Sequence, residues 1–342
     1  MTQHHVVELL GDGISPELSR AVHQVAEVVP GDIDFQQVDM SLEARTERGE
    51  AVYGEAVTKM QGAGVGLKYP TATVAESPNK VLRDRLGFAV IHRPVATIPG
   101  IENNFKRTID VDIVRIGLGG TYEDAGQRLR ADIAVSLRVI QRQPSLHAAR
   151  FAFKLAMLRN GGAGVVATSK YTIQKAADGL FQEAVEDVAQ DYPSIPYRKE
   201  LFDALLAGII MNPDRYQVIV CPNEYGDFLS DTACGLIGSI GLGDSASYAF
   251  KDDGSISCAM FDPAGGTAPD IAGQNICNPT AALFAFGSLL RHIGQVDAGK
   301  ALRASIKDAI AAGEKTADIG GSLKTDEFTE VVANRLQAKL AE

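Results

Sequence analysis

The stretch Val6-Val-Glu-Leu-Leu10, which runs directly into Gly11-Asp-Gly-Ile-Ser-Pro-Glu17, decides the fold class. Residues 6–10 are a short apolar run of the kind that forms a β-strand. From residue 18 to residue 29 the apolar residues recur at helical spacing. Ser15 stands where a helix N-cap is expected, and Pro16 stands at the first helical position. The chain is therefore predicted to begin with a strand followed by a helix.

The same alternation of strand and helix continues along the chain. Short apolar strands are predicted at residues 64–68, 88–91, 111–115, 164–167 and 217–221, and amphipathic helices at 176–188 and 279–292. The last 40 residues or so are rich in Ala and Lys and are predicted to be helical. This alternation indicates an α/β architecture. Residues 131–138 alternate polar and apolar, which suggests strands beyond the main sheet.

Composition excludes several classes of function. The 342 residues carry a net charge of −10 without a basic cluster, which argues against a nucleic-acid partner. No apolar run approaches the roughly 18 residues that a membrane span needs. The start of the chain, MTQHHVVELLGDG, lacks the basic and apolar regions of a secretion signal, so we expect a soluble, cytoplasmic protein. The four cysteines have no CxxC spacing and are expected to be buried free thiols.

Two aspartates four residues apart are the most informative polar feature. If the segment Gly226-Asp-Phe-Leu-Ser-Asp231 is helical, Asp227 and Asp231 share one face and repel each other. Mg²⁺ or Mn²⁺ would relieve that repulsion, because both ions prefer hard oxygen ligands. Asp203, 24 residues before Asp227, is a third candidate ligand. A solvated acidic helix face is the alternative for such a pair on its own.

Three arginines form a second group. Arg83, Arg93 and Arg115 are predicted to lie near strand ends, with Ser77 and Asn79 close by in the sequence. Guanidinium groups bind carboxylates through two hydrogen bonds and stay charged when water is removed. The set suits a substrate with several carboxylates, although any one arginine alone could be structural. Since the protein is acidic overall, an anion site has to be a local pocket of this kind.

Candidate proton-transfer and nucleotide-binding residues complete the pattern. Lys170 directly follows the predicted strand 164–167, and active sites of open α/β sheets collect at such strand ends. A lysine near a metal there could transfer protons, as could Tyr122. The loop 265–273 could approach a nucleotide closely, with Asp270 accepting hydrogen bonds from the ribose hydroxyls of NAD. No GxGxxG segment lies between a strand and a helix, so a Rossmann fingerprint is absent.

Taken in order, these segments resemble the β-decarboxylating dehydrogenases, which include isocitrate, 3-isopropylmalate and homoisocitrate dehydrogenases. The resemblance covers nearly the whole chain. Its motifs are Gly11-Asp-Gly-Ile-Ser-Pro-Glu17, Leu67-Lys-Tyr-Pro70, Arg93-Pro94, Val114-Arg115, Tyr122, Lys170, the three aspartates, and Gly266-Thr-Ala-Pro-Asp-Ile-Ala-Gly273 with Asn278-Pro279. It implies a two-domain α/β fold with a mixed, non-Rossmann sheet. Residues 1–94 and 256–342 would form the large cofactor-binding domain, and residues 95–255 a small domain for dimerisation and metal binding.

The resemblance also implies roles for individual residues. The catalytic residues would be Tyr122, Lys170 and Asp203, and the metal ligands Asp203, Asp227 and Asp231. The substrate would be held by Ser77, Asn79, Arg83, Arg93 and Arg115. NAD would be held by Thr71, Gly266, Thr267, Ala268, Asp270, Ile271 and Asn278. Because Lys170 and Asp203 would serve the neighbouring subunit's site, the implied unit is a homodimer with shared active sites.

The implied function is NAD-dependent oxidative decarboxylation, with Mg²⁺ or Mn²⁺, of a 2-hydroxy acid bearing a 3-carboxylate. Ser77, Asn79 and Arg83 are similar to the isocitrate branch, which predicts conversion of isocitrate to 2-oxoglutarate. Two departures leave other substrates open: Gly265 replaces the family's histidine, and residues 116–120 replace its acidic run. The alternatives are homoisocitrate or a phosphonate analogue in a specialised biosynthetic pathway, then 3-isopropylmalate or tartrate. A non-catalytic regulatory subunit is the alternative from another class.

Overall fold

A ten-stranded mixed sheet organises the computed structural model, which describes residues 3–74, 76–159, 164–239 and 242–341. The strand order is β2-β1-β3-β12-β11-β4-β5-β10-β8-β9. The strands are β1 (Gln3–Leu10), β2 (Asp32–Asp39), β3 (Val65–Lys68), β4 (Val90–Ala96), β5 (Asp110–Ile116), β8 (Val165–Ser169), β9 (Tyr197–Leu201), β10 (Val218–Cys221), β11 (Asp244–Phe250) and β12 (Ile256–Pro263). This confirms the predicted α/β fold with a mixed, non-Rossmann sheet.

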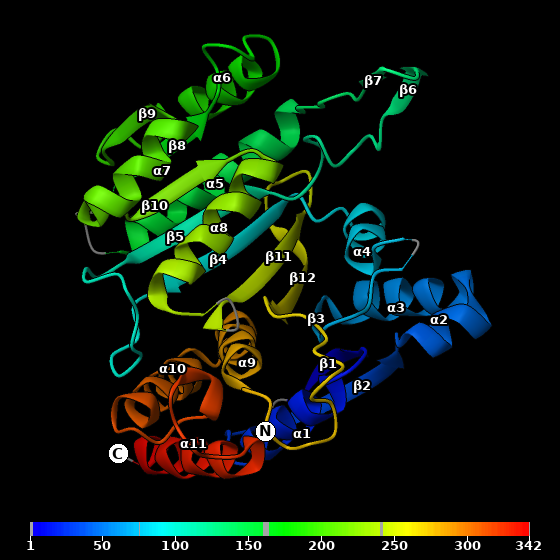
Figure 1. Ribbon diagram of the computed structural model, residues 1–342, viewed down its shortest axis with the longest axis vertical. Coiled ribbons are helices and arrows are strands. Elements are labelled where there is room, and N and C mark those ends of the chain that lie inside the picture. The colour runs from blue at the N-terminus through cyan, green and yellow to red at the C-terminus, as the bar shows by residue number, and fades with distance from the viewer. Residues whose placement is uncertain (1–2, 75, 160–163, 240–241, 342) are drawn as a thin grey trace.

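The direction of the strands changes at the centre of the sheet. Strands β11 and β12, β11 and β4, and β4 and β5 pair antiparallel, whereas the pairs toward both edges are parallel. Parallel neighbours need long crossover connections, and helices supply these connections. Figure 1 shows the sheet running through the molecule between its helices.

The described helices cover both faces of the sheet. They are α1 (Ser15–Ala26), α2 (Leu42–Arg48), α3 (Glu50–Ala63), α4 (Pro78–Leu86), α5 (Arg142–Leu158), α6 (Ala177–Ala189), α7 (Phe202–Met211), α8 (Asn223–Ile237), α9 (Thr280–His292), α10 (Val296–Ala311) and α11 (Thr325–Leu340). Short 3-10 turns lie at Pro213–Arg215 and Ala317–Ile319. Helices α1, α9, α10 and α11 pack on one another, while α2, α3 and α4 lie together at another edge (Figure 1).

Strand β1 shows why both faces have to be covered. Val7 and Leu9 pack into one apolar cluster with Val52 and Met60 of α3, whereas Val6 packs into the other cluster, which includes residues of α1 and α9. Successive side chains of a strand point to opposite faces, so an apolar run such as 6–10 is stable only between two layers of helices.

The six strands and two central helices predicted from the sequence are confirmed, with two local corrections. The first helix begins at Ser15 and ends at Ala26, so Ser15 is a helical residue and not the N-cap, which is Ile14. The Ser15 hydroxyl instead accepts a hydrogen bond from the Gly11 amide at 2.7 Å. The predicted domain division at residues 94/95 falls within β4, and the division stays a prediction.

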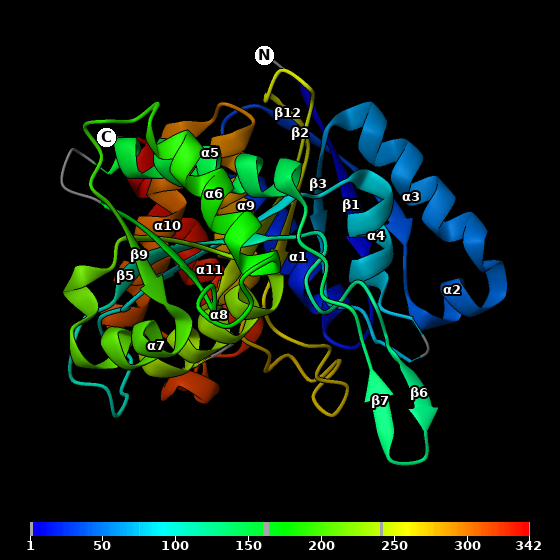
Figure 2. The same cartoon turned by 90° about the horizontal axis from the view of Figure 1, so that it is seen from above.

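A short hairpin projects from the body of the protein. Strands β6 (Gln127–Arg130) and β7 (Ile133–Val135) pair antiparallel in a sheet of their own, as the alternation of residues 131–138 suggested. Figure 2 shows the hairpin standing away from the rest of the fold. Three apolar side chains on or next to the hairpin are largely exposed: Leu129, Val135 and Leu137.

No helix among the described residues is both long enough and apolar enough to cross a membrane. All four cysteines are buried and free, as predicted.

Candidate active site

Helix α8 places the two aspartates on one face, as their spacing predicted. Arg93 of β4 bridges them, because its Nη1 lies 3.3 Å from Oδ1 of Asp227 and 3.3 Å from Oδ1 of Asp231. The same nitrogen donates to Ser230 Oγ at 2.6 Å. The mutual repulsion of the two carboxylates is therefore partly offset by one arginine within the chain.

The register of the sheet brings a second arginine to the same face. Strands β4 and β5 pair Arg93 with Ile113 and Ile91 with Arg115, so the two arginines are diagonal neighbours on one side of the sheet. Arg115 is almost completely buried and donates through Nη1 to Asp227 and through Nε to Asn223 Oδ1 at 2.8 Å. Burial lowers the pKa of Arg115 to about 10, and repulsion from Arg93 and Arg83 adds to this. Arg115 remains charged at neutral pH.

Arg83 comes from helix α4 and not from a strand end, which corrects that part of the prediction. Burial lowers its pKa, and repulsion from Arg93 contributes. Ser77 begins this helix as N-cap and accepts a hydrogen bond from the Lys80 amide at 3.4 Å. Among the described residues, Asn79 Oδ1 and the Nε atoms of Arg83 and Arg93 are buried without a hydrogen-bond partner. Buried polar atoms are usually paired, so unpaired ones suggest a site for a ligand.

These side chains line a pocket of about 690 Å³. Its walls come from α4, β4, β5, the loop after β5 and the start of α8. The residues that line it are Ser77, Asn79, Lys80, Arg83, Asp84, Arg93, Arg115, Gly117, Gly119, Thr121, Tyr122, Glu123, Asp124, Ala125, Asn223 and Asp227. All five predicted substrate-binding residues are among them.

Tyr122 reaches the same aspartate from the loop after β5. Its hydroxyl donates to Asp227 Oδ2 at 3.0 Å, and its ring centroid lies 5.8 Å from the Arg115 guanidinium carbon. Burial and the Asp227 charge raise the pKa of Tyr122. For Asp227, burial opposes ionisation, but Arg115 and Arg93 outweigh it and lower the pKa. At neutral pH the pair is thus a protonated phenol beside a carboxylate.

Lys170 and Asp203 form a separate pair. Lys170 follows β8, Asp203 lies in the first turn of α7, and Lys170 Nζ is 2.9 Å from Asp203 Oδ1. This hydrogen bond is the main cause of a lowered pKa for Asp203, which is 68% exposed. Neither residue is among those that line the pocket. Across the described residues, no group of three or more His, Cys, Asp and Glu side chains could hold a metal ion.

The predicted cofactor loop follows β12 and is fixed by the turn that opens the chain. The Ile14 amide donates to the Thr267 carbonyl at 2.9 Å, and Glu17 accepts from the amides of Gly273 at 2.8 Å and Asn275 at 2.7 Å. A Cβ on Gly13 would lie 1.9 Å from the Thr267 carbonyl oxygen, so only glycine permits this close approach.

The other predicted cofactor residues lie in or next to this loop in the sequence, except Thr71, which follows β3. Asp270 is exposed, and Asn278 donates to Asp318 Oδ2 at 3.0 Å. Thr71 accepts from Lys68 Nζ at 3.1 Å, close to the Ala72 amide, which donates to Asp12. The remaining members are Gly266, Thr267, Ala268 and Ile271, which belong to the same loop. The Cβ position of Gly265 has no neighbouring atom within 4 Å.

Two pairs of residues that organise the site were not among those predicted from the sequence. Asp12 and Glu17 fix the loops described above, and a carboxylate in a turn between strand and helix was the available signal. Asn223 donates to the carbonyls of Gly117 at 3.4 Å and Gly119 at 2.8 Å, and Glu224 accepts from the Thr121 amide at 3.3 Å. Both stand just before Asp227 in the chain, but their partners lie about 100 residues away.

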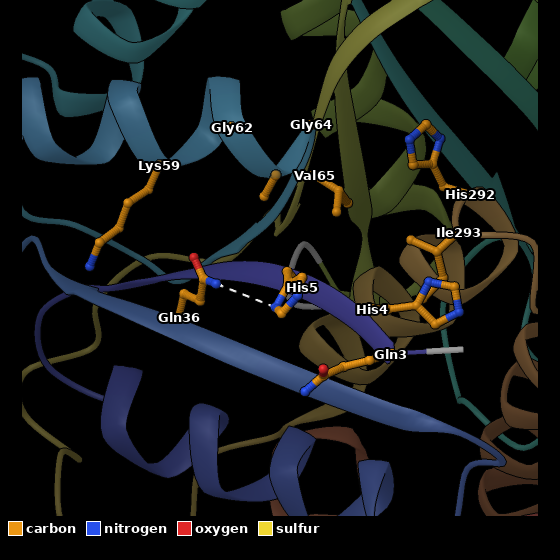
Figure 3. Close-up of a pocket in the computed structure, with 11 residues that line it drawn as sticks. Gln3, His4, His5, Gln36, Lys59, Gly62, Gly64, Val65, His292 and Ile293 are labelled. Carbon is orange, nitrogen blue, oxygen red and sulfur yellow. Dashed lines mark hydrogen bonds between the residues drawn. The ribbon is translucent and has the colours of Figure 1, made fainter. Parts of the chain in front are cut away.

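A second hollow, of about 510 Å³, carries less chemistry (Figure 3). Two of its polar side chains already have partners, because Lys59 lies 2.9 Å from Glu55 and His5 lies 2.7 Å from Asp34. The residues that line it are Gln3, His4, His5, Gln36, Lys59, Gly62, Ala63, Gly64, Val65, His292 and Ile293. It takes no part in the predicted site.

Comparison with known proteins identifies the family of this chain. The family model described as isocitrate/isopropylmalate dehydrogenase matches residues 5–332. The chain belongs to this family. A 3-isopropylmalate dehydrogenase of Archaeoglobus fulgidus is 34% identical over 97% of this chain and 99% of that protein. An NAD isocitrate dehydrogenase catalytic subunit of Arabidopsis thaliana is 33% identical over 95% of this chain and 87% of that protein.

Solved structures agree at the level of the fold. The crystal structure of isocitrate dehydrogenase from Methylococcus capsulatus matches with a TM-score of 0.89 and 28% identity, covering 98% of this chain and 99% of that one. The family comprises decarboxylating dehydrogenases, which supports an enzymatic role. Relatives of similar identity act on isocitrate and on 3-isopropylmalate, so membership leaves the substrate open.

Proposed function

We propose that this protein catalyses the NAD-dependent, divalent-metal-dependent oxidative decarboxylation of isocitrate to 2-oxoglutarate. The observation that carries the proposal is the convergence of Arg83, Arg93 and Arg115 on one pocket. Each guanidinium repels the other two, and the Asp227 carboxylate contacts both Arg93 and Arg115. A substrate with several carboxylates would relieve this repulsion and fill the unpaired hydrogen-bonding positions.

The polar end of the pocket supports isocitrate over a substrate with an apolar branch. The Ser77 side chain and the free Asn79 oxygen lie at the start of α4, and Arg83 from the last turn of the same helix lines the pocket with them. An apolar branch there would leave these buried groups without partners, which a site rejects strongly. Homoisocitrate and a phosphonate analogue keep the required charge and stay as alternatives; 3-isopropylmalate and tartrate fit less well.

The aspartates fit Mg²⁺ or Mn²⁺ by their chemistry, since Asp227 and Asp231 offer hard carboxylate oxygens on one helix face. Two carboxylates leave room for the substrate and for one more protein ligand. When bound, the metal would polarise the C2 oxygen of the substrate, and NAD would accept the hydride from C2. Asp270, exposed in the loop after β12, would accept hydrogen bonds from the ribose of NAD and repel the 2′-phosphate of NADP.

The remaining steps need a base and an acid. Lys170, held by Asp203, would take the proton of the C2 hydroxyl, and loss of CO₂ from C3 would follow. Tyr122 would then protonate C3 and would recover its proton from water. The raised pKa of Tyr122 supports this role, because the phenol stays protonated until the enolate forms.

We infer a homodimer in which Lys170 and Asp203 complete the neighbouring subunit's site. Two observations support it. Within one chain these residues pair with each other and do not line the pocket. In the part of the chain that the structure describes, no three His, Cys, Asp or Glu side chains come close enough to hold a metal ion together. The projecting β6–β7 hairpin, with exposed Leu129 and Leu137, offers an apolar surface for a second copy.

The proposal is tested by assaying NADH and NADPH formation by the purified protein. The panel comprises isocitrate, homoisocitrate, 3-isopropylmalate, tartrate and a phosphonate analogue, each with Mg²⁺, with Mn²⁺ and with EDTA. We expect the highest kcat/KM with isocitrate, NAD and a metal. Equal turnover with a metal and with EDTA would exclude the proposed mechanism. A protein that binds isocitrate but is inactive on its own would instead indicate a regulatory subunit.

A further inference from the structure

Arg138 lies outside the pocket but at the centre of a buried ionic cluster. It follows β7, its side chain is 12% exposed, and it contacts the carboxylates of Asp178 through Nη1 and Glu224 through Nε. The Asp178 side chain is completely buried and that of Glu224 is 5% exposed. Two carboxylates this deeply buried need a cation, and the planar guanidinium can bond to both at once.

The first contact leads to Lys170. Asp178 lies in the first turn of α6, and its second oxygen accepts a hydrogen bond from the Lys170 backbone amide at 2.6 Å. Arg138 therefore holds the Asp178 carboxylate, and Asp178 in turn holds the backbone of Lys170, the proposed base.

The second contact leads to Tyr122. The other oxygen of Glu224 accepts from the Thr121 amide at 3.3 Å, one residue before Tyr122. A Cβ on Gly120 would lie 2.3 Å from that oxygen, and Gly120 has a φ of +78°, so the carboxylate sits directly against the loop. The residue after Arg138, Val139, forms a β-bridge with Gly120, which holds the same loop from the other side.

A third contact leads to Asp203. The Arg138 guanidinium carbon lies 4.8 Å from the ring centroid of Tyr225, and this ring stacks on Phe202 with centroids 4.5 Å apart. Phe202 is the first residue of α7 and directly precedes Asp203. The three proposed proton-transfer residues, Lys170, Tyr122 and Asp203, come from distant segments of the chain. Each is held by a neighbouring residue that Arg138 contacts directly or through the Tyr225 ring.

We propose that Arg138 is a positioning residue that sets the relative placement of Lys170, Asp203 and Tyr122. This inference rests on the proposed function, because the three residues matter only if they move protons. The polar and ring contacts of Arg138 among the described residues are with Asp178, Glu224 and Tyr225, and not with the substrate arginines or the cofactor loop. Its loss should therefore lower kcat and leave substrate affinity largely intact, since small misplacement of reacting groups alone can cost about 100-fold in rate.

The test compares Arg138→Met and Arg138→Lys with Arg303→Met. Arg303 is a matched control: it is 20% exposed, pairs with the buried Asp244 and stands over the Phe284 ring, but contacts none of the pocket residues named above. Arg138→Lys keeps the charge without the two-sided fork, so it tests the idea even if Arg138→Met does not fold. The measurements are kcat, isocitrate affinity by calorimetry, and amide hydrogen exchange of the full chain.

We expect kcat to fall about 100-fold in Arg138→Met and about tenfold in Arg138→Lys, with the isocitrate Kd changed less than threefold. Amide exchange should speed up in residues 168–174 and 117–122, but not in these segments of Arg303→Met. A folded Arg138 variant with near-normal kcat overturns the inference, as does an equal loss in Arg303→Met. Failure of the proposed function is distinguishable, because the unmodified protein would then be inactive on the whole substrate panel.

Discussion

The buried Arg115 forms a direct ion pair with Asp227, while Tyr122 donates to the other oxygen of the same carboxylate. These contacts lower the pKa of Asp227 and orient its carboxylate. Arg115 on β5 and Arg93 on β4 are diagonal neighbours in the β4–β5 ladder, so both reach Asp227 from the same side of the sheet. The Asp227 carboxylate can therefore contact the substrate-binding arginines, the proposed acid Tyr122 and the proposed metal at the same time.

Replacing Asp227 with Asn should remove a metal ligand and unbalance the arginines. We expect weaker Mn²⁺ binding and activity at least about 100-fold lower, the upper end of what loss of an outer-shell metal partner costs. Calorimetric titration with Mn²⁺ checks the first result and steady-state kinetics the second. Asp308→Asn is the control, since Asp308 forms a surface pair with Lys339 at 2.9 Å. Unchanged Mn²⁺ affinity would remove Asp227 from the metal site.

Replacing Tyr122 with Phe should slow the last proton transfer and leave hydride transfer intact. We expect kcat to fall about 100- to 10,000-fold, the usual contribution of a general acid. NADH should still form in a rapid burst while release of 2-oxoglutarate lags, which stopped-flow and quenched-flow measurements can separate. Tyr192→Phe, whose ring stacks on Phe153, is the control. Full turnover by the Tyr122 variant would contradict the assignment.

Replacing Asn79 with Leu should shift the preference among substrates. The change removes a buried polar group at the start of α4 and adds an apolar side chain of similar size. We expect kcat/KM for isocitrate to fall about 10- to 100-fold, equivalent to one hydrogen bond to a charged group. The value for 3-isopropylmalate should stay level or rise. An equal fall for both substrates would show that Asn79 does not distinguish them.

Replacing Gly265 with His should strengthen NAD binding. The Cβ position has no atom within 4 Å, and Gly265 has no left-handed φ, so the larger side chain can be accommodated. An aromatic ring beside the adenine would contribute about 1 kcal/mol, or about a fivefold lower Kd for NAD. Fluorescence titration with NADH checks this, with Gly54→His on helix α3 as the control, since its Cβ position is also open and its φ is not left-handed. A weaker affinity would show that the loop excludes a ring.

Replacing His23 with Gln should change how stability depends on pH. The buried Glu8 accepts hydrogen bonds from His23, Ser19, Tyr69 and Gln37. The hydrogen bond with Glu8 raises the pKa of His23. A raised pKa in the folded state means that the charged histidine stabilises the fold below its unfolded pKa. This contribution is lost as pH rises through the folded value.

His23→Gln should therefore lower the free energy of unfolding more at pH 5.5 than at pH 8.5. We expect the two losses of unfolding free energy to differ by about 1 kcal/mol. The difference is smaller than for a fully buried ion pair, because His23 is 38% exposed and water screens its charge. Urea denaturation at the two pH values measures it. Equal costs at both values would show that His23 does not carry the charge in the folded state.

The sequence determined the parts of the fold whose signal is local. Runs such as 6–10 and 217–221 predicted buried strands, because a strand covered on both faces has to be apolar throughout. It missed four strands of the ten-stranded sheet, two at its edges and two near its centre. The edge strands are β2 and β9: β2 reads Asp-Ile-Asp-Phe-Gln-Gln-Val-Asp and is largely accessible, so no apolar run marks it. The central strands are β11 and β12: β11 carries the buried serines Ser245 and Ser247, so it too lacks an apolar run. It also placed Arg83 at a strand end, whereas the arginine lies on a helix.

For the site, the spacing of Asp227 and Asp231 predicted a shared helix face, because the i,i+4 relation is a property of the helix alone. Only the tertiary structure decided which arginines meet those aspartates, since the register of β4 against β5 and the packing of α8 join residues more than 100 positions apart. The same holds for Arg138, whose partners lie 40 and 86 positions along the chain. Pairing over such distances depends on how elements pack, and no local pattern of residues records it.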